Sequence, residues 1–191
     1  MSQNYAAATN RVPGNPGVWL FLFIELTTFA LLFVSYAVLY RLNPEVFRAG
    51  QNSLAMSWGA INTLLLLTSG MSMVLATSAS SEGCLQQVRA ALRWTFLLGA
   101  AYLVSKFSEW CLLFSNGITM SSNRFYGFYY FLTAFHWMHV LLGLICVIRV
   151  RNGLRPEQLK DLHPDALESV AAYWHTLDLL WIVIFFLLYL I

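Results

Sequence analysis

Charged residues are scarce in this chain. Of its 191 residues only 10% are Asp, Glu, Lys or Arg, whereas 59% are hydrophobic. A soluble domain typically carries about 25% charged residues, so the composition excludes an ordinary soluble protein. The net charge of +2 is too small to attract nucleic acid, and no basic run or nucleic-acid-binding motif is present. We therefore expect a polytopic membrane protein, built as one domain, that binds no nucleic acid.

Cysteine is also scarce, so we expect neither disulfide bonds nor cysteine-bound metal ions to stabilise the fold. The three cysteines, Cys84, Cys111 and Cys146, lie far apart and form neither a metal-binding nor a disulfide pattern. Two of them lie in apolar stretches, where a free cysteine acts as a small apolar filler. The sequence contains no internal repeat and no low-complexity tract.

Long hydrophobic runs are what the chain has in abundance. Five such runs cover residues 17–39, 57–79, 91–115, 126–148 and 171–191. A membrane span needs about 20 residues, and because lipid cannot satisfy backbone polar groups, each run must be a helix. The fold class predicted is an all-α bundle of five transmembrane helices. Residues 40–50, with Asn43 and Pro44, are expected to form an external loop, and Pro164 is expected to open the last helix early.

The distribution of basic residues predicts the orientation of the bundle. One side carries seven of them: Arg11, Arg89, Arg93, Arg149, Arg151, Arg155 and Lys160. The other side carries three: Arg41, Arg48 and Arg124. Lys and Arg are retained on the cytoplasmic side, so we expect the N-terminus inside and the C-terminus outside.

Several titratable side chains interrupt the apolar runs. They are Glu25, Lys106, Glu109, His136, His139, His175 and Asp178. An ionisable group at membrane depth costs roughly 3 kcal/mol or more on insertion scales, so it must face the bundle interior and find a partner. These residues are therefore the candidate site, as an intramembrane polar network.

Helical spacing groups these side chains by face. His136 and His139 share a face of the fourth span with Gly143, which would allow a neighbouring helix to approach closely. His175 and Asp178 share a face of the fifth span by the same spacing.

Depth separates the polar residues into two layers. Lys106 and Glu109 share a face of the third span, lie in its outer half and can neutralise each other. We call the remaining group in the inner half the inner polar cluster; it consists of Glu25, His139, His175 and Asp178. We expect it to be hydrogen-bonded and to join the first, fourth and fifth spans, and the sequence does not decide which groups pair.

Three chemical roles compete with a structural one for these residues. Two histidines on different helices could ligate haem, but His136 and His139 share one helix and no second pair faces them. The same histidines with nearby acids could hold a metal ion, yet a carboxylate–histidine network needs no metal. A proton relay through Glu25 and Asp178 would suit an autonomous carrier, although broken helices and repeats are not visible. A structural network in a non-catalytic subunit remains the favoured interpretation.

Five motifs in chain order resemble subunit III of the haem–copper oxidases. Residues 17–25 resemble its glutamate-bearing helix, and residues 60–70 its Asn-Thr…Ser-Gly helix. Residues 107–110 are similar to its Glu-aromatic segment, and residues 134–140 to its Phe-His-x-x-His-Val signature. Residues 173–181 resemble its Trp-His-x-x-Asp…Trp closing helix. The motifs fall on all five spans, which makes the set specific.

The resemblance implies a five-helix version of a fold that also occurs with seven. It implies a non-enzymatic subunit of a bacterial inner-membrane complex, with no haem or copper of its own. Its partner would be a haem-containing catalytic subunit, whose stability and proton uptake it supports, and a structural phospholipid would occupy a cleft between its helices. The family-signature positions carried across are Glu25, Glu109, His136, His139, His175 and Asp178.

Departures from the family pattern refine the expectation. Lys106 stands where the oxidase pattern typically has Gln, and Trp137-Met138 replaces a small Gly-Leu pair. The closing residues 175–183 and the short N-terminus are closer to the NorE-type branch associated with nitric oxide reductase. The interpretation favoured from sequence is thus a nitric oxide reductase accessory subunit. The alternatives are subunit III of a cytochrome c or quinol oxidase and, in a different class, an autonomous proton carrier.

Overall fold

The structure, a computed structural model, describes residues 16–154 and 164–190. Predictions that rest on Arg11, Arg155 and Lys160 lie outside these residues. The elements are α1 (Pro16–Leu42), α2 (Pro44–Ser53), α3 (Met56–Ser81), α4 (Leu85–Ser115), α5 (Arg124–Gly153), α6 (Pro164–Phe185) and the π-helical turn η2 (Phe186–Leu190). Within the described ranges the chain is entirely helical apart from its connections, which confirms the all-α class.

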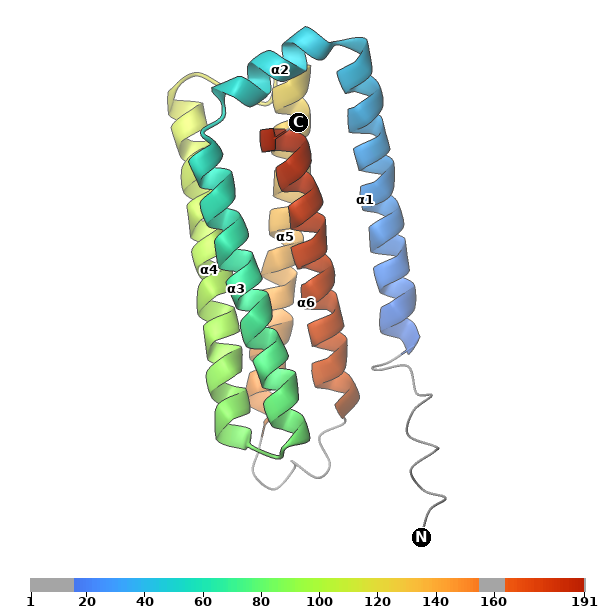
Figure 1. Cartoon of the computed structure of the whole chain (residues 1–191), viewed down its shortest axis with the longest axis vertical. Coiled ribbons are helices and arrows are strands. Elements are labelled where there is room, and N and C mark those ends of the chain that lie inside the picture. Colours follow the sequence, from blue (N-terminus) through green and yellow to red (C-terminus); the bar gives the residue numbers. More distant parts are fainter. Residues whose placement is uncertain (1–15, 155–163, 191) are drawn as a thin grey trace.

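Five helices are long and apolar enough to cross a membrane, as predicted. They run up and down between two ends of one bundle, so that α1 begins at one end and α6 finishes at the other (Figure 1). The helices exceed the predicted spans: α4 begins at Leu85 rather than residue 91, and α5 continues to Gly153. Hydrophobicity marks only the lipid-embedded part of a helix, whose polar ends continue beyond it. The last helix begins at Pro164, as expected.

The expected external loop at residues 40–50 is wrong in one respect. The end of α1 and most of α2 occupy it, and α2 lies across one end of the bundle (Figure 1). Pro44 opens α2 instead of lying in a loop, because proline is favoured in a first helical turn, where it fixes φ and lacks an N–H that would be unpaired anyway. One apolar side chain, Phe47, anchors α2, because it is fully buried with its ring 5.1 Å from that of Tyr36.

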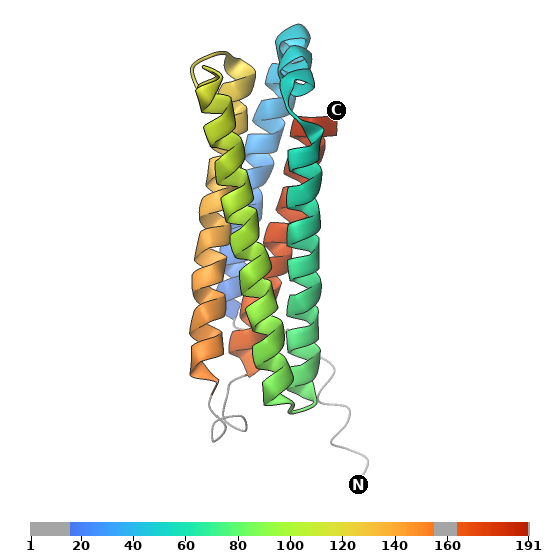
Figure 2. The ribbon, with the colours of Figure 1, turned by 90° about the vertical axis from the view of Figure 1, so that its left-hand side faces the viewer.

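The long helices differ in how deeply they are packed. α3 and α4 form a close antiparallel pair, joined where the Ser69 hydroxyl donates to the Thr95 carbonyl at 2.9 Å. α5 and α6 complete a four-helix body, and α1 stands at its edge (Figures 1 and 2). In the apolar window of α1 only 11% of residues are buried, against 44% in α3, α5 and α6. α1 therefore offers most of its surface to lipid or to a partner.

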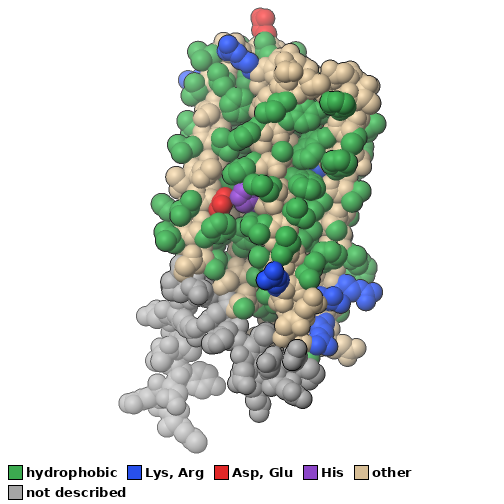
Figure 3. Space-filling view, turned by 180° about the vertical axis from the view of Figure 1, so that it is seen from behind, with side chains coloured by type: hydrophobic (Ala, Val, Ile, Leu, Met, Phe, Trp, Pro, Cys, Tyr) green, Lys and Arg blue, Asp and Glu red, His purple; other side chains and the backbone are tan. Residues whose placement is uncertain are grey.

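The surface matches a membrane environment. Figure 3 shows hydrophobic side chains over the middle of one face, with Lys and Arg side chains mainly toward the two ends. One acidic and one histidine side chain lie next to each other within this apolar belt (Figure 3). The chain is thus a multi-pass membrane protein with polar chemistry at membrane depth.

Candidate functional site

Lys106 and Glu109 form a closed ionic network in the core. The Lys106 side chain is fully buried and its Nζ donates to Glu109 Oε2 at 2.9 Å, to Tyr189 Oη at 2.7 Å and to Tyr129 Oη at 3.2 Å. Both tyrosine hydroxyls donate in turn to Glu109 Oε1, at 2.7 Å from Tyr129 and 2.6 Å from Tyr189. Every ammonium proton and both carboxylate oxygens are therefore engaged, which is the condition for keeping a charge pair in a dry interior.

This network confirms the predicted neutralisation of Lys106 by Glu109 and adds two residues that the sequence did not reveal. Tyr129 comes from α5 and Tyr189 from η2, so the network joins three elements near the α2 end of the bundle. The sequence did indicate that further partners exist, because a lysine ammonium group has three protons to donate in hydrogen bonds. A single carboxylate three residues away cannot accept all of them, so further acceptors were required.

Glu25 and His139 form the second ion pair, between α1 and α5. Glu25 Oε2 lies 2.9 Å from His139 Nε2, with side-chain exposures of 15% and 7%. The other ring nitrogen, Nδ1, lies 2.6 Å from the Phe135 carbonyl oxygen. Because a carbonyl only accepts, Nδ1 donates to it, and Nε2 is the ring nitrogen that faces the Glu25 carboxyl. The pair holds α1, the least buried helix, to the bundle.

His175 and Asp178 are placed apart from that pair. His175 Nδ1 lies 3.6 Å from Asp178 Oδ2, and the His175 side chain is 42% exposed. Asp178 packs against α3 at Gly70, where an added Cβ would lie 2.2 Å from its Oδ2. The expectation of one inner polar cluster is therefore corrected: one pair lies between α1 and α5, and the other faces α3. Helical spacing gives the face of a residue but not which neighbouring helix that face meets.

The junction of the fourth and fifth predicted spans is made by other residues. The Tyr173 hydroxyl of α6 donates to the His139 carbonyl of α5 at 3.1 Å. Trp174 lies against Gly143, where an added Cβ would be 3.0 Å from its ring. The space left by Gly143 is therefore filled by side chains of α6, and the predicted close approach of a helix backbone is not seen there. His136 is fully buried, with its ring 5.4 Å from that of Trp181.

The described residues offer no metal site of the usual kind. Across residues 16–154 and 164–190, no three His, Cys, Asp or Glu side chains gather closely enough to hold a metal ion. Cys84, Cys111 and Cys146 are all free thiols. The ionic contacts that the titratable side chains make are Lys106–Glu109, Glu25–His139 and His175–Asp178.

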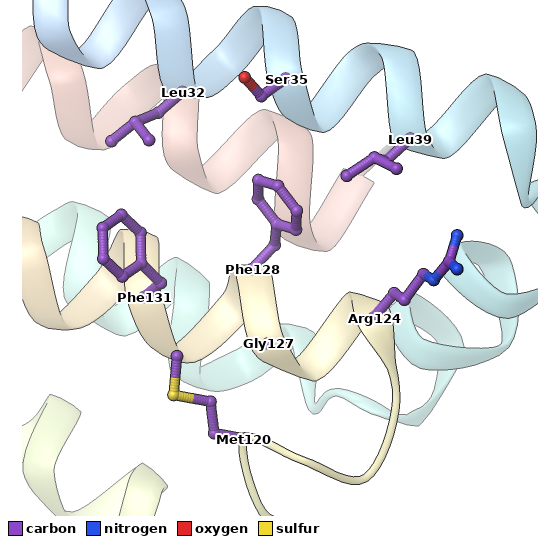
Figure 4. Close-up of a pocket in the computed structure, with 8 residues that line it drawn as sticks. All are labelled: Leu32, Ser35, Leu39, Met120, Arg124, Gly127, Phe128 and Phe131. Atoms are coloured by element: carbon purple, nitrogen blue, oxygen red, sulfur yellow. The ribbon is translucent and has the colours of Figure 1, made fainter.

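An apolar groove lies between α1 and α5 at the α2 end. Its volume is about 510 Å³, and its lining consists of Leu32, Ser35, Leu39, Met120, Arg124, Gly127, Phe128 and Phe131. Figure 4 shows Leu32 and Leu39 on α1 opposite Phe128 and Phe131 on α5, with the cationic Arg124 at one end. The groove combines an apolar wall with a single positive charge.

Comparison with known proteins defines the class. The family model for cytochrome c oxidase subunit III matches residues 13–191, so the chain belongs to this family. Together with the five apolar helices, this makes it a multi-pass protein of the membrane, which in bacteria is the inner membrane.

Individual relatives are subunits of two kinds of oxidase. The cytochrome bo(3) ubiquinol oxidase subunit 3 of Pseudomonas aeruginosa is 29% identical over 174 residues, which cover 91% of this chain and 83% of the relative. The cytochrome c oxidase subunit 3 of Corynebacterium diphtheriae is 29% identical over 92% of this chain and 86% of its own length. The quinol oxidase subunit 3 of Bacillus spizizenii is 29% identical over 88% of this chain and 82% of the relative.

Proposed function

We propose that this chain is the accessory subunit III of a haem–copper quinol or cytochrome c oxidase. In this role it packs beside the haem-containing catalytic subunit, carries no redox centre of its own, and supports the stability and activity of the complex. The family match over residues 13–191 and the oxidase names of the relatives support the proposal. They favour an oxidase as the partner. The nitric oxide reductase partner, expected from the closing helix and the short N-terminus, stays a prediction.

The observation that carries the proposal is that the intramembrane charges neutralise one another. Lys106 is enclosed by Glu109 and two tyrosines, and Glu25 is paired with His139. Groups engaged in this way join helices, because Glu25 and His139 link α1 to α5, and Tyr129 and Tyr189 link the Lys106–Glu109 pair of α4 to α5 and η2. A reaction centre would instead hold a titratable group or metal ligand open toward a substrate.

The surface supports association with another membrane component. Apolar side chains cover the long helices, and the weakly buried α1 is the most open of them. His175 is 42% exposed in the middle of α6, which is an unfavourable place for a polar ring facing lipid. We infer that the face around His175 meets the catalytic subunit, which would supply a hydrogen-bonding group at that depth.

The groove between α1 and α5 suits a phospholipid. Acyl chains would lie along Leu32, Phe128 and Phe131, and the phosphate would approach Arg124. Native mass spectrometry of the wild type and R124Q tests this assignment. Loss of retained anionic lipid in R124Q supports it, and unchanged retention contradicts it.

For the orientation we infer a cytoplasmic N-terminus. Among the described residues, Arg89, Arg93, Arg149 and Arg151 lie at the end of the bundle opposite α2. Arg41, Arg48 and Arg124 lie at the α2 end, which would then face outward. A C-terminal alkaline phosphatase fusion should be active, and an inactive phosphatase with an active cytoplasmic reporter would reverse the assignment.

Purification from native membranes tests the function. The tagged chain, extracted gently, should bring down a haem- and copper-containing subunit whose preparation reduces oxygen with quinol or cytochrome c as donor. Recovery with a complex that reduces nitric oxide instead would favour the alternative partner. Recovery without any haem protein would refute both, and the chain reconstituted alone would then be assayed for proton flux sensitive to E25Q.

A further inference from the structure

Polar side chains at one level of the bundle core find no hydrogen-bond partner among residues 16–154 and 164–190. Asn62 on α3, Tyr102 on α4 and His136 on α5 each have 0% of their surface exposed. Within the part of the chain that the structure describes, the Asn62 amide, the Tyr102 hydroxyl and both His136 ring nitrogens make no hydrogen bond. Buried polar groups in folded proteins are paired with protein or with ordered water in the great majority of cases. Three such residues on three helices therefore require an explanation.

The helix register places these residues at one level. Ser69 and Thr95 exchange hydrogen bonds between the antiparallel helices α3 and α4. Seven residues, about two helical turns, separate Asn62 from Ser69 and Tyr102 from Thr95, which brings Asn62 opposite Tyr102. The Tyr102 ring lies 5.9 Å from the His136 ring.

Trp181 of α6 forms a wall of the same layer. Its ring lies 5.0 Å from that of Tyr102 and 5.4 Å from that of His136. Its own Nε1 donates to Thr63 Oγ1 at 3.0 Å, so the indole N–H is already used. The Trp181 ring thus lies beside the unpaired groups but has no N–H left to donate to them.

The neighbouring network of Lys106 and Glu109 has no free hydrogen-bond donor for these groups either. Lys106 lies one helical turn from Tyr102, but its three ammonium protons go to Glu109, Tyr129 and Tyr189. Those two tyrosine hydroxyls are likewise directed to Glu109. Residues 16–154 and 164–190 thus complete the ionic network in full but supply no hydrogen-bond partner to the adjacent layer.

We propose that Asn62, Tyr102 and His136 enclose an internal water site in the middle of the transmembrane bundle. The set offers both donors and acceptors: the Asn62 amide has both, a hydroxyl has both, and a neutral imidazole has one of each. Water donates two hydrogen bonds and accepts two, so it matches this mixture, and buried waters typically bridge about three otherwise unpaired groups. An apolar ligand would leave every one of these groups unpaired.

Radiolytic footprinting tests the site directly. X-ray pulses convert bound water to hydroxyl radicals, which oxidise side chains beside it even when bulk solvent is excluded. In the purified complex, Tyr102 and Trp181 should be oxidised although both are fully buried. Met73, also fully buried and on α3 far from this layer, is the control and should remain unmodified. Absence of oxidation at Tyr102 and Trp181, with exposed Trp94 labelled, overturns the proposal.

A matched pair of hydroxyl deletions gives an independent readout. The Tyr36 hydroxyl donates to the Leu187 carbonyl at 2.8 Å and accepts from Gln51 Nε2 at 3.2 Å, so Y36F calibrates the loss of a tyrosine hydroxyl with known hydrogen bonds. Y102F should lower the thermal midpoint in the same direction, because it removes a bond to the water. An unchanged or higher midpoint for Y102F shows a dry layer and overturns the proposal. A lower midpoint without oxidation at Tyr102 shows a direct protein partner and overturns it equally.

Discussion

Glu25 and His139 depend on each other because each is the other's ion-pair partner at a largely buried position between α1 and α5. E25L leaves the His139 ring nitrogen without its partner in a largely buried position. We expect a loss of about 1–3 kcal/mol in the free energy of unfolding, whereas E25Q should lose less because an amide can still hydrogen-bond to Nε2. Unfolding of the purified protein in detergent, followed by circular dichroism against temperature, measures both. Equal stability of E25L and the wild type would show that the pair does not hold α1.

Replacing Lys106 should cost more, because its side chain is fully buried and its ammonium group is enclosed by Glu109, Tyr129 and Tyr189. K106M leaves Glu109 as an uncompensated charge facing two tyrosines, and we expect a loss of about 3–5 kcal/mol. The double variant K106M/E109L removes both charges and should recover most of that loss, since buried ion pairs are often no more stabilising than apolar replacements. The measurement is the same thermal unfolding. A double variant as unstable as K106M would contradict the account.

The sequence predicted that these titratable side chains are buried, which holds for most of them but not for His175, and it did not predict how they pair. Lys106 and Glu109 are three residues apart on one helix, and local spacing was enough to predict their contact. The separation of His175 and Asp178 from Glu25 and His139 depends on how the helices are arranged around one another, which spacing does not contain. Tyr129 and Tyr189 were missed because a tyrosine in an apolar stretch resembles any packing residue until a buried charge needs its hydroxyl.

Among the helices, the contact between α3 and α6 depends on the absence of one side chain. At Gly70 an added Cβ would lie 2.2 Å from Asp178 Oδ2, so G70A must displace either the carboxylate or a helix. We expect a loss of about 1–3 kcal/mol, typical of overpacking. Thermal unfolding of G70A measures it.

Gly153 at the end of α5 supplies the matched control for G70A. An added Cβ there meets no atom within 4 Å, so G153A should leave stability unchanged or slightly raised. Similar effects of the two substitutions would show that the Gly70–Asp178 contact contributes nothing.

Hydropathy predicts the five long helices but not the short helix α2. All five spans were predicted, because a run of about 20 apolar residues has few alternatives to a membrane helix. The helix α2 was missed, since a short, polar segment beginning with proline looks the same as a loop. Its helix becomes stable through Phe47, which packs on the ends of α1 and α5, and that tertiary contact is not visible in local sequence.

The molecule as a whole is a bundle whose internal charges are paired and whose apolar outside is left for lipid and a partner. Its family membership extends over residues 13–191, and its relatives are oxidase subunits. The resemblance to the family could be predicted from the ordered motifs. The choice of a nitric oxide reductase partner rested on residues 175–183 and the short N-terminus, which carry less information about the partner than relatedness along the whole chain.

As proposed, this chain stabilises the oxidase complex without contributing a redox centre. The most direct measurement is the haem and copper content per catalytic subunit, in complexes purified from the wild type and from a strain lacking this chain. We expect the ratios and the reduced-minus-oxidised spectrum to be unchanged, with turnover that declines faster in the complex without the chain. A fall in haem or copper per catalytic subunit would contradict the account.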